Sequence, residues 1–184
     1  MLRFVVRLAL CTLLGAVLCA AELPGVWLDV PFVKQEKNGC GAASIAMVMQ
    51  YWQRQHGSVA SDDVKQIQQA LYSRQAHGVY ASAMESYLQE RGFRTFAFRG
   101  EWKDLREHLE KGRPLIVALK TGRDNLHYVV VSGLDWQEGV VLKNDPAERK
   151  LLKQTRSSFE KEWKAAGNWT LLALPQQKER SSSQ

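Results

Sequence analysis

Sequence patterns typical of helices and of strands occupy different halves of this 184-residue chain. The expected helices, read from apolar spacing and capping residues, run from Cys40 to about Trp52, from Ser61 as N-cap past Leu71, from about Ala81 to Arg91, and from about Trp102 to Lys111. Short runs rich in Val, Leu and Ile follow at Pro114–Lys120, Leu126–Ser132, Gly139–Asn144 and Trp169–Leu174, with a short helix at Ser157–Ala166 before the last. This order predicts an α+β fold in which an N-terminal helical part packs on an antiparallel sheet.

The first 21 residues have the pattern of a secretory signal peptide. Arg3 and Arg7 precede an uncharged apolar run, Leu8 to Ala21, that ends in small residues. This run is shorter than the roughly 20 residues that cross a bilayer, so cleavage and export to the periplasm or the medium are expected rather than a signal-anchored form. A lipoprotein signal at Cys19 is the alternative, which the bulky Leu18 disfavours. The expected divisions are a signal peptide (1–21), one domain (22–175) and a disordered polar tail (176–184).

Cleavage after residue 21 leaves Cys40 as the one cysteine of the mature chain, so no internal disulfide can form. A free thiol is a chemical liability in an oxidising compartment. Cys40 starts an expected helix and precedes the small residues Gly41 to Ala43, where unpaired N–H groups and the helix dipole favour a thiolate. A small buried residue is the structural alternative, and a nucleophile is the functional hypothesis.

A thiol nucleophile needs a base, and the chain has four histidines. His56 and His77 lie in polar stretches, and His108 borders the face of a short helix. His127 differs because it opens an apolar strand. His127 is therefore the candidate base, with a core or edge residue as the structural alternative.

The remaining parts of an acyl-transfer site are an orienting group and an oxyanion donor. A hairpin centred near Trp136 would place Asp145 opposite His127, where a carboxylate can hold the imidazole. The structural alternative for Asp145 is a turn residue before a proline. The backbone N–H of Cys40 and the side-chain amide of Gln35 are candidate donors to a developing oxyanion.

Four segments around these residues carry a resemblance to a known family. They are VPFVKQ at 30–35, CGAA at 40–43, HYVVV at 127–131 and NDPA at 144–147, and FEKEW at 159–163 adds a late helix of stand-alone, exported relatives. The chain resembles the bacteriocin-processing (double-glycine) peptidases, a branch of the papain-like cysteine peptidases. Gly39 differs from the aspartate that is common in transporter-fused members.

The resemblance implies a papain-like fold and amide hydrolysis through a thioester acyl-enzyme. It implies that Cys40 is the nucleophile, His127 the general acid and base, Asp145 the orienting group and Gln35 the oxyanion donor. The expected protein is thus an exported cysteine peptidase. The alternatives are an acyl-transfer or cell-wall amidase enzyme with the same site, and a catalytically silent peptide-binding module.

Charge and ligand spacing bear on partners and cofactors. The net charge of +6 is spread over mixed-sign segments, so a nucleic-acid partner is not expected. No two histidines have i, i+3 or i+4 spacing, so neither a metal nor another cofactor is expected. We expect a peptide or protein substrate, a monomer, and no stable membrane span after signal cleavage.

Overall fold

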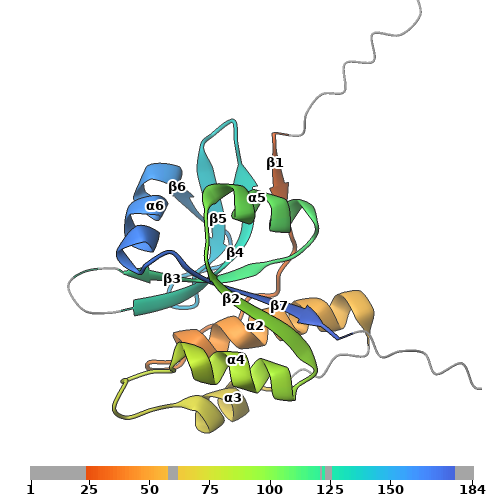
Figure 1. Cartoon of the computed structure of the whole chain (residues 1–184), viewed down its shortest axis with the longest axis vertical. Helices are drawn as coiled ribbons and strands as arrows, with labels where there is room; N and C mark the ends of the chain where they lie inside the picture. The colour runs from red at the N-terminus through yellow and green to blue at the C-terminus, as the bar shows by residue number, and fades with distance from the viewer. Residues whose placement is uncertain (1–23, 58–61, 121, 123–125, 177–184) are drawn as a thin grey trace, which may run out of the picture.

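A computed structural model describes residues 24–57, 62–120, 122 and 126–176. The expected signal peptide and all but the first residue of the expected tail lie outside the described residues. The elements in chain order are β1 (Gly25–Trp27), α2 (Cys40–His56), α3 (Val64–Leu71), α4 (Ala81–Glu90), β2 (Phe93–Arg99), α5 (Trp102–Glu110), β3 (Leu115–Lys120), β4 (Leu126–Asp135), β5 (Val140–Asn144), β6 (Leu152–Thr155), α6 (Arg156–Ala165) and β7 (Trp169–Pro175). The predicted α+β class and antiparallel sheet are confirmed (Figure 1).

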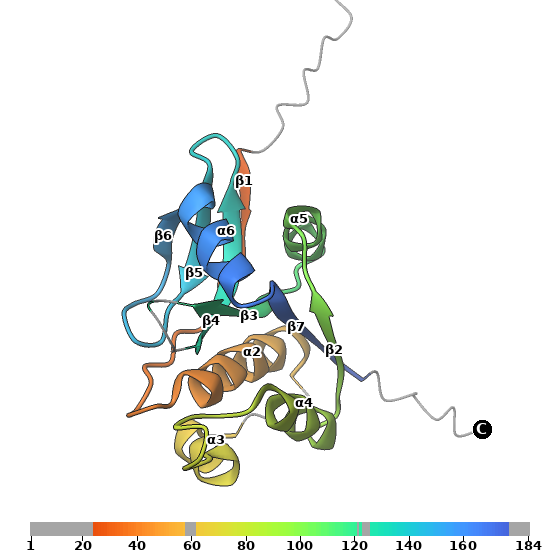
Figure 2. The same cartoon turned by 60° about the vertical axis from the view of Figure 1, so that its left-hand side comes forward.

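The strands form one sheet in the order β2-β7-β3-β4-β5-β6, and β1 pairs with β4. Helices cover both faces of it. Figures 1 and 2 show α2, α3 and α4 on one side and α5 and α6 on the other. Successive residues of β3 and β4 enter the two hydrophobic cores in turn, so both strands are almost continuously apolar, as strands buried on both faces are.

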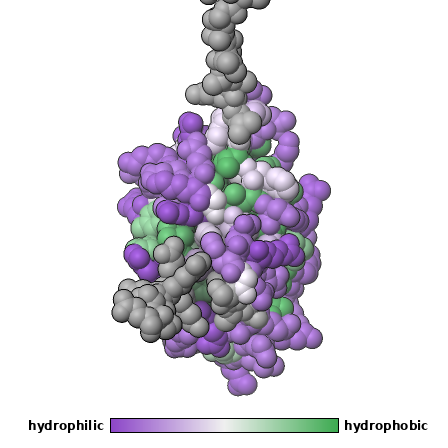
Figure 3. All heavy atoms as spheres, turned by 90° about the vertical axis from the view of Figure 1, so that its right-hand side faces the viewer, coloured by the Kyte–Doolittle hydropathy of each residue, from purple (hydrophilic) through white to green (hydrophobic). Residues whose placement is uncertain are grey.

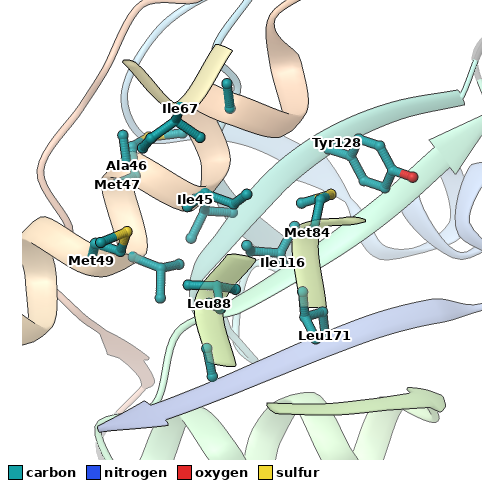
Figure 4. Close-up of a cluster of buried hydrophobic side chains, with 14 of the residues drawn as sticks. Ile45, Ala46, Met47, Met49, Ile67, Met84, Leu88, Ile116, Tyr128 and Leu171 are labelled. Atoms are coloured by element: carbon teal, nitrogen blue, oxygen red, sulfur yellow. The ribbon is translucent and has the colours of Figure 1, made fainter. Parts of the chain in front are cut away.

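Helix α2 is the centre of the larger core. Residues 41–49 of this helix are all buried, as expected for a helix that is covered on most of its circumference. Figure 4 shows Ile45 of α2 among Leu88 of α4, Ile116 of β3 and Leu171 of β7. The Trp52 indole N–H also donates to the Ala173 carbonyl of β7 at 2.9 Å. The packing therefore fixes the start of α2, and with it Cys40, relative to the sheet.

The predicted start of one helix was wrong, and three strands were not predicted. Helix α3 begins at Val64 and is capped by Asp63, whose Oδ1 accepts the Lys65 backbone N–H at 2.8 Å; the expected cap, Ser61, lies outside the described residues. Strands β1, β2 and β6 were not predicted. They are short or partly exposed edge strands with few or no fully buried residues.

One face of the molecule is mainly polar. Figure 3 shows one face on which hydrophilic residues predominate and hydrophobic residues form small areas between them. None of the helices in the described ranges is long and apolar enough to span a membrane.

Gly100, between β2 and α5, is expected to tolerate no side chain. A Cβ atom there would lie 2.6 Å from both Thr170 Oγ1 and Trp163 Cζ2. We expect Gly100→Ala to lower the free energy of unfolding by about 1–3 kcal/mol, measured by urea denaturation. Gly78→Ala is the control, because the nearest atom to its Cβ would be 3.8 Å away. Equal losses in both variants would contradict the steric explanation.

Candidate active site

Cys40 is the first residue of the 17-residue helix α2. Its N-cap, Gly39, provides no side-chain hydrogen bond, so backbone N–H groups at this end are available to an anion. Burial by itself would raise the pKa of the Cys40 thiol. A hydrogen bond from His127, another from the Tyr128 backbone N–H and the charge of His127 outweigh burial and lower that pKa, with a smaller contribution from the Gly41 N–H. The site therefore favours a thiolate.

His127 is the second residue of β4 and lies between Cys40 and Asp145. Its Nε2 is 2.7 Å from Asp145 Oδ1, and its ring also hydrogen-bonds to Cys40. Burial would lower the pKa of His127, but the hydrogen bonds to Asp145 and Cys40 and their negative charges raise it to about 9. Both shifts favour a thiolate next to an imidazolium over a neutral thiol and imidazole.

Asp145 follows the last residue of β5 and precedes Pro146. The Ala147 backbone N–H donates to Oδ1 at 3.1 Å, and the Lys143 ammonium lies 3.5 Å from Oδ2. Burial would raise the pKa of Asp145, but the hydrogen bond to His127 and the charges of His127 and Lys143 lower it. The carboxylate is thus held ionised with both oxygens occupied.

The predicted meeting of His127 and Asp145 occurs, but in a register that the sequence did not indicate. Strand β4 pairs Val130 with Asn144, and a bulge at Ser132 shifts the pairing further along the hairpin. The turn spans residues 136–139, so its centre lies beyond Trp136, and Asp145 is not directly opposite His127. The two side chains reach each other diagonally, from just beyond the end of the β4–β5 ladder.

The loop before α2 is fixed to the loop after β5. The fully buried Asn144 donates from Nδ2 to the carbonyls of Val30 at 3.1 Å and Pro31 at 3.4 Å, and its Oδ1 accepts the Leu151 N–H at 3.0 Å. The Lys34 ammonium donates to the Ala147 carbonyl at 2.6 Å. These bonds join two segments that lie more than 100 residues apart in the sequence.

Gln35 lies within this junction. Its backbone N–H donates to the Pro146 carbonyl at 3.0 Å, and its side chain is half-buried. The side-chain Oε1 is buried without a hydrogen-bond partner among the described residues. The backbone of Gln35 is therefore held against the turn that carries Asp145, while its amide has no protein partner at Oε1.

Sequence reasoning missed two residues of this site. Lys143 is the one charged residue of β5 and follows three apolar residues, which was the available signal of an unusual environment. Asn144 precedes Asp145 in the NDPA segment, but nothing in a single sequence indicates that it is buried and makes three hydrogen bonds. Of the other histidines, His56 lies at the opposite end of α2 and stacks on Trp52.

No group of three or more His, Cys, Asp or Glu side chains is arranged to hold a metal ion within the described part of the chain. The chemistry available at the site is that of a thiolate, an imidazolium, a carboxylate and backbone N–H groups. Such a set suits nucleophilic attack on an acyl carbon.

One family model matches most of the described chain. The model of the Peptidase_C39 like family matches residues 27–171. No curated protein matches the sequence significantly.

Solved structures share the fold at low sequence identity. The peptidase domain of Streptococcus ComA, a bifunctional ABC transporter involved in quorum sensing, has 21% identity and a TM-score of 0.65 over 79% of this chain and 98% of its own. A double-glycine motif protease of an AMS/PCAT transporter, solved with a leader peptide, has 22% identity and a TM-score of 0.63 over 84% of this chain and 99% of its own. A C39-like peptidase from Bacillus anthracis has 20% identity, with the same TM-score and coverage. The predicted papain-like fold is confirmed.

Proposed function

Because this chain belongs to the Peptidase_C39 like family, we propose that it is a cysteine peptidase in which Cys40 is the nucleophile, His127 the general acid and base, and Asp145 the orienting group. The observation that supports this proposal is the 2.7 Å contact between His127 Nε2 and Asp145 Oδ1, beside a Cys40 thiol whose pKa His127 lowers. These residues come from the start of α2, the start of β4 and the end of β5, so only the folded chain assembles them.

The reaction follows from the protonation states of the pair. The Cys40 thiolate attacks the carbonyl carbon of a peptide bond and forms a tetrahedral oxyanion. The His127 imidazolium gives its proton to the leaving amine as the C–N bond breaks, which leaves a thioester. The neutral imidazole then takes a proton from water, the resulting hydroxide attacks the thioester, and collapse releases the carboxylic acid product and the Cys40 thiolate.

Asp145 and Gln35 serve this reaction without changing their covalent bonds. With Oδ1 at 2.7 Å from Nε2, Asp145 holds the His127 ring so that its other nitrogen faces Cys40. Gln35 and the backbone N–H of Cys40 are proposed to donate hydrogen bonds to the oxyanion. The bond from the Gln35 N–H to Pro146 supports this role, because it fixes the Gln35 backbone against the loop of Asp145.

The proposed substrate is a peptide or protein segment, and the proposed place of action is outside the cytoplasm. The structure that includes a leader peptide supports the first statement by similarity. The basic and apolar pattern of residues 1–21 supports the second. Residues 22–175 are proposed to form the single working domain, and the protein is proposed to act as a monomer.

A peptide library incubated with the mature chain tests the proposal. We expect products with new free carboxyl and amino termini, identified by mass spectrometry. Amine adducts at the new carboxyl terminus would instead indicate acyl transfer. Binding of library peptides without any product or acyl-enzyme would contradict the proposal and indicate a silent binding module.

A further inference from the structure

Lys143 has an unusual environment for a lysine. Its side chain is 6% exposed, and its ammonium lies 3.5 Å from Oδ2 of Asp145, whose side chain is 7% exposed. A buried ammonium is costly unless it is paired, so a position of this kind calls for a partner of opposite charge. The residues paired with Lys143 on the neighbouring strands, Val131 and Leu152, are apolar. Asp145 is its one ion-pair partner within the described residues.

The two oxygens of Asp145 are therefore divided between two cations. Oδ1 contacts His127 Nε2 and the Ala147 N–H, and Oδ2 faces Lys143. The nearby Lys34 ammonium donates to backbone carbonyls of the same loop instead of the carboxylate. The carboxylate thus shares its negative charge between an imidazolium and an ammonium.

We propose that Lys143 is a positioning residue of the peptidase: its ammonium fixes the Asp145 carboxylate with Oδ1 toward His127, and its positive charge limits how strongly the carboxylate stabilises the imidazolium. This inference rests on the proposed function. A less strongly stabilised imidazolium is a stronger acid, and His127 must donate a proton to the leaving amine in the acylation step. Lys143 therefore acts on the reaction through Asp145 and His127 without contacting the substrate.

The direction of the effect follows from the charges. The groups that face the His127 ring are Asp145 and Cys40, while its neighbour on β3, Leu119, is apolar. Replacing Lys143 by methionine removes a positive charge from beside Asp145, so the pKa of His127 should rise further. The thiolate–imidazolium pair should then persist to higher pH, by about 0.5–1 pH unit.

The test is kcat/KM for cleavage of a library-derived peptide as a function of pH, because the upper limb of that profile reports loss of the His127 proton that the leaving amine needs. It compares wild type with Lys143→Met, Lys143→Arg and, as a matched control, Lys153→Met, which removes an exposed ammonium from the adjacent strand β6. We expect the upper limb of the profile to move to higher pH in Lys143→Met only. Lys143→Arg keeps the charge and should retain the wild-type profile. Cleavage of a library-derived peptide should fall about 10-fold in Lys143→Met, mainly in kcat.

Circular dichroism and thermal melting establish that each variant is folded, and Lys143→Gln replaces the methionine variant if that one is not. An upper limb that is unchanged in the folded neutral variant would overturn the role of Lys143 and leave the peptidase proposal standing. A wild-type profile that His127→Ala does not alter would overturn the proposed function itself.

Discussion

Cys40→Ser is expected to reduce peptide cleavage by about 10⁴-fold or more, measured as kcat/KM on a peptide from the library screen. A serine hydroxyl has nearly the same size as the thiol, so the start of α2 and its packing should be retained. Unlike the thiol, the hydroxyl is not ionised by a neighbouring imidazole in the ground state. The His127 ring would therefore face a neutral, weak nucleophile.

Two measurements make this result interpretable. An unchanged thermal melting temperature would show that the loss is chemical. Peptide binding to Cys40→Ser, followed by fluorescence anisotropy, should remain within about threefold of wild type. Cleavage by Cys40→Ser at the wild-type rate would assign the reaction to a different group and contradict the proposed nucleophile.

His127→Ala is expected to lower Cys40 alkylation at pH 6 by about 100-fold. Without His127, burial remains while the largest influence that lowers the pKa of Cys40, the His127 hydrogen bond, is lost together with the His127 charge. A thiol with the ordinary pKa of about 8.5 has less than about 1% thiolate at this pH. Peptide cleavage should be lost as well, because the general acid is absent.

The rate of peptide cleavage by the wild-type protein, plotted against pH, should fall at both low and high pH. Activity requires the thiolate and the imidazolium together, so it falls as pH drops below the lowered pKa of Cys40. It also falls as pH rises through about 9, where His127 loses its proton. His56→Ala is the matched control, since His56 lies at the other end of α2. Equal alkylation of wild type and His127→Ala at pH 6 would contradict a coupled pair.

The parts of the fold that could be predicted from sequence are those with strong apolar patterns. Residues 41–49 of α2, strand β3 and the middle of β4 are buried and largely apolar, so their residues identify these elements without tertiary information. The edge strand β2 has no such pattern, because several of its residues face solvent and pairing with β7 determines its conformation. The start of α3 was misplaced because Ser61 and Asp63 are both good N-caps, and the chain uses Asp63.

The candidate site could be predicted in its members but not in its geometry. The hairpin estimate centred the turn on Trp136, whereas the turn spans residues 136–139, yet the diagonal reach of the side chains still brings His127 and Asp145 to 2.7 Å. The placement of Lys143 and Asn144 could not be predicted, because burial of a polar side chain depends on strands and loops distant in the sequence.

The hydrogen bonds of Asn144 to Val30 and Pro31 have a consequence for the folding of the chain. The segment before Cys40 acquires its place only after β4 and β5 have paired, and these strands are among the last elements to leave a ribosome or a translocation channel. Until then the cysteine lacks both its imidazole and the donors that stabilise a thiolate. We therefore expect the nascent chain to carry an ordinary, weakly nucleophilic thiol until β4 and β5 have paired.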